Sequence, residues 1–273
     1  MQLRDALRQA EAGGLPRLDA QLLLGHVLRQ TRTWLVAHDD DTLTPLQAHA
    51  WQGVLARRLA GEPLAYIVGK HGFYGLVLDV SPAVLVPRPE TELLVDWALE
   101  CLPTSPSPAA IDLGTGSGAV ALALKHSAPG AEVTATDASA AALTVAQGNA
   151  DRVGLALKFA LGSWWRAVPG RNFGLALSNP PYIAGADPHL AALQHEPRMA
   201  LTPEGDGLDA LRDIVHAAPE HLLPGAWLLL EHGYDQGPAV RALLSQRGFS
   251  QAQTRPDLAG IPRCTGAVWR PAN

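Results

Sequence analysis

The stretch with the clearest chemical potential is Ser-Asn-Pro-Pro-Tyr at residues 178–182, directly after the apolar run Phe-Gly-Leu-Ala-Leu. One proline suffices to end a strand, so the amide, the second proline and the phenol need another explanation. The side-chain oxygen of Asn179 and the main-chain oxygen of Pro180 are two acceptors that can hold a planar NH2 group. Tyr182 can stack on the flat face of that group. The stretch therefore predicts chemistry on an amide-type nitrogen, with a plain turn after a strand as the alternative.

A second candidate site is the glycine-rich stretch Ile-Asp-Leu-Gly-Thr-Gly-Ser-Gly-Ala-Val. Gly114, Gly116 and Gly118 allow the backbone to turn sharply and to approach a ligand closely. The next expected strand ends in Asp137, about 20 residues downstream, where a carboxylate can accept hydrogen bonds from both hydroxyls of a ribose. The order and spacing of these residues predict a nucleotide-type site.

The ligand of this site differs from a dinucleotide. The spacing is Gly-x-Gly-x-Gly, with alanine at position 119, rather than Gly-x-Gly-x-x-Gly. Asp112 precedes the turn, and its carboxylate would repel a pyrophosphate but attract a positively charged group. A ligand with a ribose, a cation and no phosphate is S-adenosylmethionine, which we favour over NAD.

Alternating strand-like and helix-like segments from residue 108 onward position these two sites. The strands are predicted at 109–114, 131–137, 157–161, 173–179, 225–233, 249–257 and 266–270, and the helices at 117–126, 138–154, 207–222 and 237–248. The alternation predicts an α/β fold with a doubly wound, mostly parallel sheet, and the final strand pair predicts an antiparallel hairpin at one edge. Residues 178–182 then lie at the carboxyl end of the fourth strand, where open α/β sheets bind ligands.

The remaining chain is predicted to form two further parts. Residues 1–70 carry apolar residues at helical spacing, with Thr44 as an expected N-cap before Pro45, and predict a small helical domain. Residues 71–88 are interpreted as a hairpin linker, which leaves 89–273 for the sheet domain.

Composition narrows the possible partners and compartment. The net charge of −5 gives no basic field for non-specific nucleic-acid binding, so no direct nucleic-acid partner is expected. Cys101 and Cys264 lie outside any Cys/His cluster and are interpreted as free thiols in the cytoplasm, without a metal. No apolar run reaches about 18 residues, so no membrane partner is expected. We expect a monomer.

Taken in order, several motifs resemble one family, the bacterial protein-(glutamine-N5) methyltransferases that modify peptide chain release factors. The similarity covers nearly the whole chain through GEPLAYIVGKHGFYGL, VLVPRPETELLV, IDLGTGSGAVALAL, SNPPYI, HEPRMAL and LLLEHGYDQG. The resemblance implies a Rossmann-like class I methyltransferase fold. It also implies methyl transfer from S-adenosylmethionine to the glutamine side-chain nitrogen of a Gly-Gly-Gln loop, with residues 1–70 docking the release factor.

The resemblance also implies roles for the matching residues. Cofactor contacts are implied for Asp112, Gly114, Thr115, Gly116, Gly118, Asp137, Ser163, Trp164 and Asn179. Substrate contacts are implied for Arg88, Glu90, Thr91, Asn179, Pro180, Pro181 and Tyr182, with Asn179, Pro180 and Tyr182 as the catalytic set. Ser163 departs from the family, which usually has an acidic residue there near the adenine amine. A serine can still accept a hydrogen bond, without charge assistance, and Trp164 can stack on adenine.

Three alternatives use similar residues. A glutamine methyltransferase of a large-subunit ribosomal protein shares the Asn-Pro-Pro-Tyr chemistry but typically lacks the Pro-Arg-Pro-Glu-Thr-Glu form found at 87–92. A DNA adenine-N6 methyltransferase would need a basic surface and a recognition region. A non-catalytic adaptor would have no use for a site that activates nitrogen. Glu196 is expected either to order the loop after the active site or to be an exposed loop carboxylate, whereas Glu231 and His232 are interpreted as structural residues.

Overall fold

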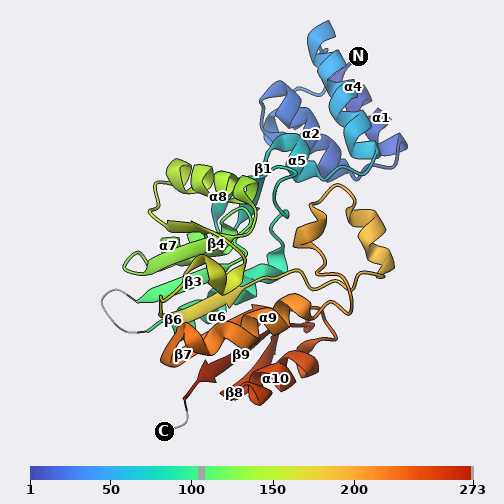
Figure 1. The fold of residues 1–273 in the computed structure, drawn as a ribbon. Helices are drawn as coiled ribbons and strands as arrows, with labels where there is room; N and C mark the ends of the chain where they lie inside the picture. Colours follow the sequence, from blue (N-terminus) through green and yellow to red (C-terminus); the bar gives the residue numbers. More distant parts are fainter. Residues whose placement is uncertain (104–107, 272–273) are drawn as a thin grey trace. The chain divides into compact units, whose positions relative to one another are not determined.

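A computed structural model describes residues 1–103 and 108–271 of the chain. The chain divides into two compact units, Met1–Lys70 and His71–Asn273 (Figure 1). Each unit has a hydrophobic core of its own, so the two are described separately.

The N-terminal unit is built from helices, as the apolar spacing predicts. Its helices are α1 (Leu3–Ala12), α2 (Arg17–Leu28), α3 (Arg32–Ala37), α4 (Pro45–Leu59) and α5 (Leu64–Val68). They enclose a core that contains Leu3, Leu24, Leu35 and Trp51. The predicted N-cap is present: the Thr44 hydroxyl accepts a hydrogen bond from the backbone N–H of Gln47, whose side chain accepts one from the backbone N–H of Thr44.

A hairpin follows at the start of the second unit. Strands β1 (Lys70–Phe73) and β2 (Leu76–Asp79) pair around Tyr74 and Gly75, which both have positive φ, as a tight hairpin turn requires. The apolar run 83–87, which the sequence associates with a hairpin or linker, forms no strand in the structure.

Within the described residues, seven strands of the second unit form one sheet. They are β3 (Ala109–Leu113), β4 (Glu132–Asp137), β5 (Lys158–Leu161), β6 (Phe173–Ser178), β7 (Leu222–Glu231), β8 (Phe249–Pro256) and β9 (Pro262–Trp269). Their order is β5-β4-β3-β6-β7-β9-β8. The pairs from β5 to β7 are parallel, and β9 is antiparallel to both β7 and β8. The predicted parallel sheet with an antiparallel hairpin at one edge is therefore confirmed.

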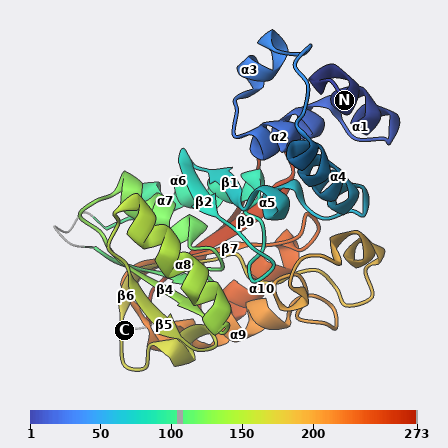
Figure 2. The same cartoon turned by 90° about the horizontal axis from the view of Figure 1, so that it is seen from above.

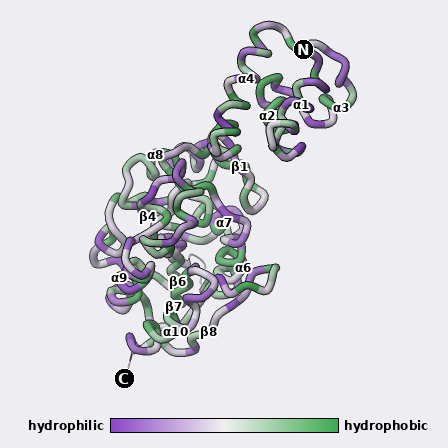
Figure 3. The backbone as a smooth tube through the Cα atoms, turned by 90° about the vertical axis from the view of Figure 1, so that its right-hand side faces the viewer, coloured by the Kyte–Doolittle hydropathy of each residue, from purple (hydrophilic) through white to green (hydrophobic). Residues whose placement is uncertain are grey.

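Helices cover both faces of this sheet (Figures 1 and 2). One face packs against α6 (Glu92–Cys101), α7 (Ala119–Ser127) and α8 (Ala140–Val153), and the other against α9 (Asp209–Ala217) and α10 (Gly237–Gln246). Short 3-10 helices complete the unit: η1 (Pro89–Thr91), η2 (Trp164–Ala167), η3 (Pro188–Leu193), η4 (Arg198–Ala200) and η5 (Ala218–Glu220). Strand β6, covered on both sides, is apolar from Phe173 to Leu177 and is buried at every position. Figure 3 colours the backbone by the hydropathy of each residue.

Strand register places the candidate residues at one edge of the sheet. Leu113 at the end of β3 pairs with Thr136 of β4 on one side and with Ser178 of β6 on the other. The loops that leave these three strands therefore begin at the same level, so the glycine turn, Asp137 and Asn179 converge there.

Candidate active site

One cavity lies where these three loops meet. Its lining comes from the loops after β3, β4, β5 and β6, from residues 83–91 and from residues 197–200. Of the residues singled out in the sequence, it is lined by Thr91, Asp112, Gly114, Thr115, Gly116, Asp137, Ser163, Trp164, Asn179 and Pro181. The structure does not bring Arg88, Glu90, Gly118, Pro180 and Tyr182 to its wall.

The glycine turn closes one side of the cavity. Gly114, Gly116 and Gly118 have φ values of +76°, +56° and +83°, a region that L side chains rarely occupy. A Cβ on Gly116 would meet no protein atom within 4 Å, so that side of the turn is open to a ligand. A Cβ on Gly118 would lie 3.2 Å from Ala146 and from Leu122. Gly118 thus serves the packing of α7 against α8.

Asp137 is held by the backbone around it. Its Oδ2 accepts a hydrogen bond from the N–H of Gly116 at 2.9 Å, and its Oδ1 accepts one from the N–H of Ser139 at 2.8 Å. Each carboxylate oxygen keeps a second lone pair. The carboxylate is therefore fixed at the cavity wall with an acceptor site left on each oxygen.

Asp112 is a buried carboxyl group on the floor of the same cavity. The Thr115 hydroxyl donates a hydrogen bond to its Oδ2 at 2.6 Å. Burial raises the pKa of Asp112 to about 7, and the hydrogen bond from Thr115 opposes this rise only in part. A cationic group in the cavity would stabilise the ionised form, so the site is suited to a positively charged ligand.

The two adjacent tryptophans have different surroundings. Trp164, at φ +50°, lines the cavity, and a Cβ on Gly114 would lie 3.0 Å from its ring. Trp165 is buried, donates its indole N–H to the carbonyl of Ile214 at 2.8 Å and stacks on His221. Trp164 with Ser163 thus forms a flat wall of the cavity, whereas Trp165 belongs to the core.

Asn179 faces the cavity from the end of β6. Its Nδ2 donates a hydrogen bond to the Thr91 hydroxyl oxygen at 3.1 Å. Because the NH2 group is engaged on the protein side, the Oδ1 oxygen remains to accept a hydrogen bond from a ligand.

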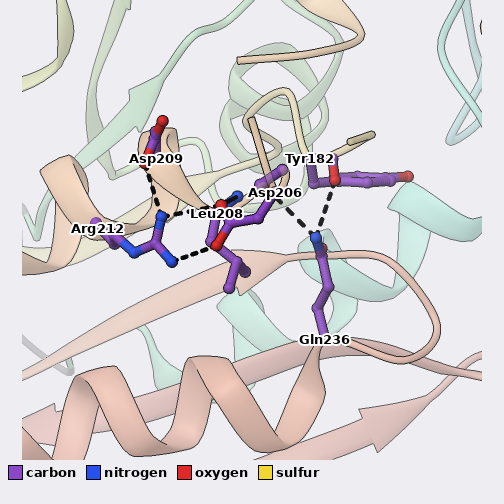
Figure 4. Close-up of polar contacts among 7 residues, drawn as sticks. Tyr182, Asp206, Leu208, Asp209, Arg212 and Gln236 are labelled. Carbon is purple, nitrogen blue, oxygen red and sulfur yellow. Dashed lines mark hydrogen bonds and ion pairs between the residues drawn. The ribbon is translucent and has the colours of Figure 1, made fainter. Parts of the chain in front are cut away.

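Tyr182 points away from the cavity wall and into the protein. Its hydroxyl donates to Oε1 of Glu231 at 3.2 Å. Its carbonyl accepts a hydrogen bond from Nε2 of Gln236 at 2.9 Å (Figure 4). Oε1 of Gln236 in turn accepts a hydrogen bond from the N–H of Gly233. The loop after β6 is thus tied to the segment after β7.

A second clamp holds the loop that follows Tyr182. Asp206 accepts hydrogen bonds from the backbone N–H of Leu208 and from the guanidinium of Arg212. Figure 4 shows these contacts in the same view as Gln236. A Cβ on Gly207 would lie 2.4 Å from the carbonyl oxygen of Tyr182, so only glycine fits there.

Arg88 stabilises the cavity wall. Its guanidinium donates to Oε1 of the buried Glu196 at 2.5 Å, and Oε2 of Glu196 accepts a hydrogen bond from the N–H of Val86. This contact joins the segment before α6 to the segment that carries residues 197–200. Glu90 is exposed beside it.

From the sequence, only a structural role was expected for Glu231. The structure buries its carboxyl group, with 2% of the residue exposed, behind Thr91 and Tyr182. Its position after a buried strand in LLLEHGYDQG was the available signal, since an acid seldom ends such a strand without a task.

Residues 1–103 and 108–271 contain neither a candidate metal site nor a candidate membrane-spanning helix. No cluster of three His, Cys, Asp or Glu side chains there could hold a metal ion. None of the helices in those ranges is both long enough and apolar enough to span a bilayer.

The sheet and its ligand edge define a methyltransferase of the Rossmann-like class. Residues 91–208 match the model of the methyltransferase small domain, and residues 1–69 match that of the PrmC N-terminal domain. Among solved structures, a methyltransferase from Pyrococcus furiosus aligns with a TM-score of 0.56 at 18% identity, over 81% of this chain and 100% of that one. That similarity concerns the fold.

Curated relatives narrow the class further. The release factor glutamine methyltransferase of Bordetella pertussis is 52% identical over 93% of this chain and 95% of its own length. That of Burkholderia pseudomallei is 47% identical over 93% of each. The chain belongs to the release factor glutamine methyltransferase family.

Proposed function

We propose that this protein transfers a methyl group from S-adenosylmethionine to the side-chain amide nitrogen of the glutamine in the Gly-Gly-Gln loop of peptide chain release factors. One arrangement supports this proposal above all. The NH2 group of Asn179 donates a hydrogen bond to Thr91, which leaves the Asn179 oxygen available to a substrate amide. Asn179 lines the same cavity as Asp112 and Asp137.

The cavity residues fit the cofactor. The open side of Gly116 and the two remaining acceptor sites of Asp137 suit a ribose, and the buried carboxyl of Asp112 suits a positive charge. Ser163 and Trp164 are assigned to adenine. When bound, S-adenosylmethionine supplies a methyl group made electrophilic by its sulfonium.

The protein's part in the reaction is to align and polarise a weak nucleophile. An amide nitrogen shares its lone pair with the carbonyl group. Acceptors on its two hydrogens favour build-up of positive charge at nitrogen, and holding the group in place removes the entropic cost of alignment. We assign one acceptor to Oδ1 of Asn179, which lines the cavity. We assign the second to the carbonyl of Pro180, the next residue, although Pro180 itself is not part of the cavity wall, and Tyr182 supports the loop that carries both.

The helical unit 1–70 is assigned to docking the release factor, and Arg88 and Glu90 to the entrance of the site. We place the protein in the cytoplasm as a monomer that contacts neither nucleic acid nor membrane.

The test supplies labelled S-adenosylmethionine with, in separate reactions, a release factor, large-subunit ribosomal proteins and duplex DNA. Label on the release factor, located on the glutamine by peptide mass spectrometry, is the expected result. Label on ribosomal protein or DNA alone would overturn the assignment.

A further inference from the structure

The helical unit has a pocket of its own, which we call the basic pocket. Its lining comes from α2, from the turn between α2 and α3, from the start of α3 and from the segment after α5. The charged side chains among its described lining residues are Arg29, Arg32 and Lys70, with His26 beside them and no Asp or Glu. All of the lining residues belong to the unit Met1–Lys70, so the pocket is complete within that unit.

The cations of this pocket differ from the other cations of the unit. Within residues 1–70, Arg29, Arg32 and Lys70 have no ion pair to a carboxylate of the described chain, and all three are exposed. The remaining arginines of the unit each pair with an Asp or Glu: Arg4, Arg8, Arg17, Arg57 and Arg58. The unneutralised positive charge of the helical unit is therefore gathered in one pocket, where like charges repel one another until an anion binds.

Arg32 is held in place by the wall of the basic pocket. Its Nε donates a hydrogen bond to Oε1 of Gln21 at 3.2 Å, and Gln21 is only 7% exposed. This contact leaves the two terminal nitrogens of the guanidinium, which can bind a carboxylate with two parallel hydrogen bonds. A side chain that is already positioned loses little freedom when it binds a partner.

Arg29 occupies a backbone position that an arginine rarely adopts. It ends α2 with φ +54°, in the left-handed region where helices commonly place glycine or asparagine. The turn is close-packed, because the N–H of Gln30 donates to the carbonyl of Gly25 and a Cβ on Gly25 would lie 2.7 Å from the carbonyl oxygen of Gln30. A strained arginine where glycine is the usual residue indicates that its side chain has a function.

We infer that the basic pocket is the part of the helical unit that binds the release factor, and that it takes an acidic segment of that protein, with carboxylates on Arg29, Arg32 and Lys70. The inference rests on the proposed function, which assigns docking to residues 1–70 without naming a surface or a chemistry. Leu22, which is 38% exposed, and Val68 add apolar contact for the same segment.

A polypeptide fits this pocket better than a nucleic acid does. The described lining residues include no Phe, Tyr or Trp on which a base could stack. The chain has a net charge of −5, so the pocket is a local basic site without the extended basic surface that follows a phosphate backbone.

Four substitutions test the charges of the pocket in the full-length protein. Arg29→Gln, Arg32→Gln and Lys70→Gln each remove one positive charge, singly and as a triple variant. Arg8→Gln is the matched control, because it removes the same charge from α1, which contributes no residue to the pocket. Calorimetry measures the Kd for an unmethylated full-length release factor. We expect each pocket variant to weaken binding by about 2- to 5-fold and the triple variant by about 10-fold or more, with the control close to wild type.

Two further readouts separate charge recognition from a loss of folding. Wild-type affinity for the release factor should fall as salt is raised, and the triple variant should show a much weaker dependence on salt. Affinity for S-adenosylmethionine should stay at the wild-type level in every variant, since no residue of 1–70 lines the cofactor cavity. A triple variant that has lost cofactor affinity as well would speak against a local role of these charges.

The outcomes distinguish this inference from the proposed function. Equal affinity of the wild type and the triple variant for the release factor, or an equal loss in Arg8→Gln, would overturn the inference while methylation by the wild type leaves the function in place. A labelled single-stranded oligonucleotide is tested in parallel, and pocket-dependent binding tighter than that of the release factor would assign the pocket to phosphates instead. A release factor left unmethylated by the wild type would contradict the proposed function and the inference together.

Discussion

Asp137 is joined to the glycine turn directly: its Oδ2 accepts the backbone N–H of Gly116 at 2.9 Å. The end of β4 therefore holds the turn that follows β3, and the carboxylate is positioned before any ligand arrives. A group held in this way binds a partner without a further cost of ordering.

Replacement of Asp137 by alanine should weaken cofactor binding. Hydrogen bonds to a charged group contribute about 1.5–3 kcal/mol, which corresponds to a loss of about 10- to 100-fold in affinity for S-adenosylmethionine. Isothermal titration calorimetry measures the change, with Asp213→Ala, an exposed carboxylate on α9, as the control. Wild-type affinity in Asp137→Ala would remove this residue from the cofactor site.

Alanine at Gly116 and at Gly118 should have different effects. Both substitutions place a side chain at positive φ, which costs on the order of 1 kcal/mol. Gly118→Ala also crowds Ala146 and Leu122, so it should lower the free energy of unfolding more than Gly116→Ala does. Gly116→Ala fills space open to the ligand, so it should lower cofactor affinity more. Urea unfolding and calorimetry test the pair, and the reverse ranking would contradict the assignment.

The contrast between these glycines shows how far the sequence predicts the site. The spacing of the glycines and Asp137, and the position of residues 178–182 after an apolar strand, predict which loops meet, because parallel strands end at one edge. The partner of each residue depends on side chains distant in sequence. The packing of Gly118 on Ala146 and the clamp of Gln236 on Tyr182 follow from tertiary structure.

The elements of the fold could also be predicted from the sequence, but the order of the strands at the edge of the sheet could not. The spacing of the apolar residues and the positions of glycine and proline predict the strands, the helices and the final hairpin. They do not say which strand of that hairpin joins the sheet, and the structure inserts β9 between β7 and β8. The neighbours of Glu231 could not be predicted either, since an acidic residue at the end of an apolar run indicates a buried carboxyl group but does not reveal which side chains surround it.

The free energy of unfolding should depend on pH through Glu231. Burial raises the pKa of Glu231 to about 7, above the usual value of 4.5. The hydroxyls of Thr91 and Tyr182 and the charge of Arg263 oppose this rise in pKa, whereas the charge of Glu90 adds to it. Cys264, which pairs with Glu231 across β7 and β9, is a further titratable neighbour. The folded state thus prefers the protonated acid. Its contribution to stability is complete below the unfolded pKa and is lost as pH rises through about 7.

The difference between wild type and Glu231→Gln isolates this effect. Relative to the variant, the wild type should lose about 1–3 kcal/mol between about pH 5 and about pH 8, at roughly 1.4 kcal/mol per pKa unit. His232 and His71 have lowered pKa values, so their contributions rise with pH, but they are common to both proteins. Urea unfolding at several pH values gives the difference, and a constant difference would contradict a raised pKa at Glu231.

The central claim is that Oδ1 of Asn179 accepts a hydrogen bond from the NH2 group of the substrate amide. Asn179→Ala removes that acceptor and leaves Asp112, Asp137 and the glycine turn unchanged. Asn172→Ala, an exposed asparagine before β6, is the matched control.

The most direct test is the single-turnover rate of methyl transfer to the release factor glutamine, with enzyme and cofactor at saturation. The account predicts a fall of about 100-fold or more in Asn179→Ala, the scale for loss of one preorganised catalytic hydrogen bond, with cofactor affinity and the control variant unchanged. A wild-type rate in Asn179→Ala would contradict it.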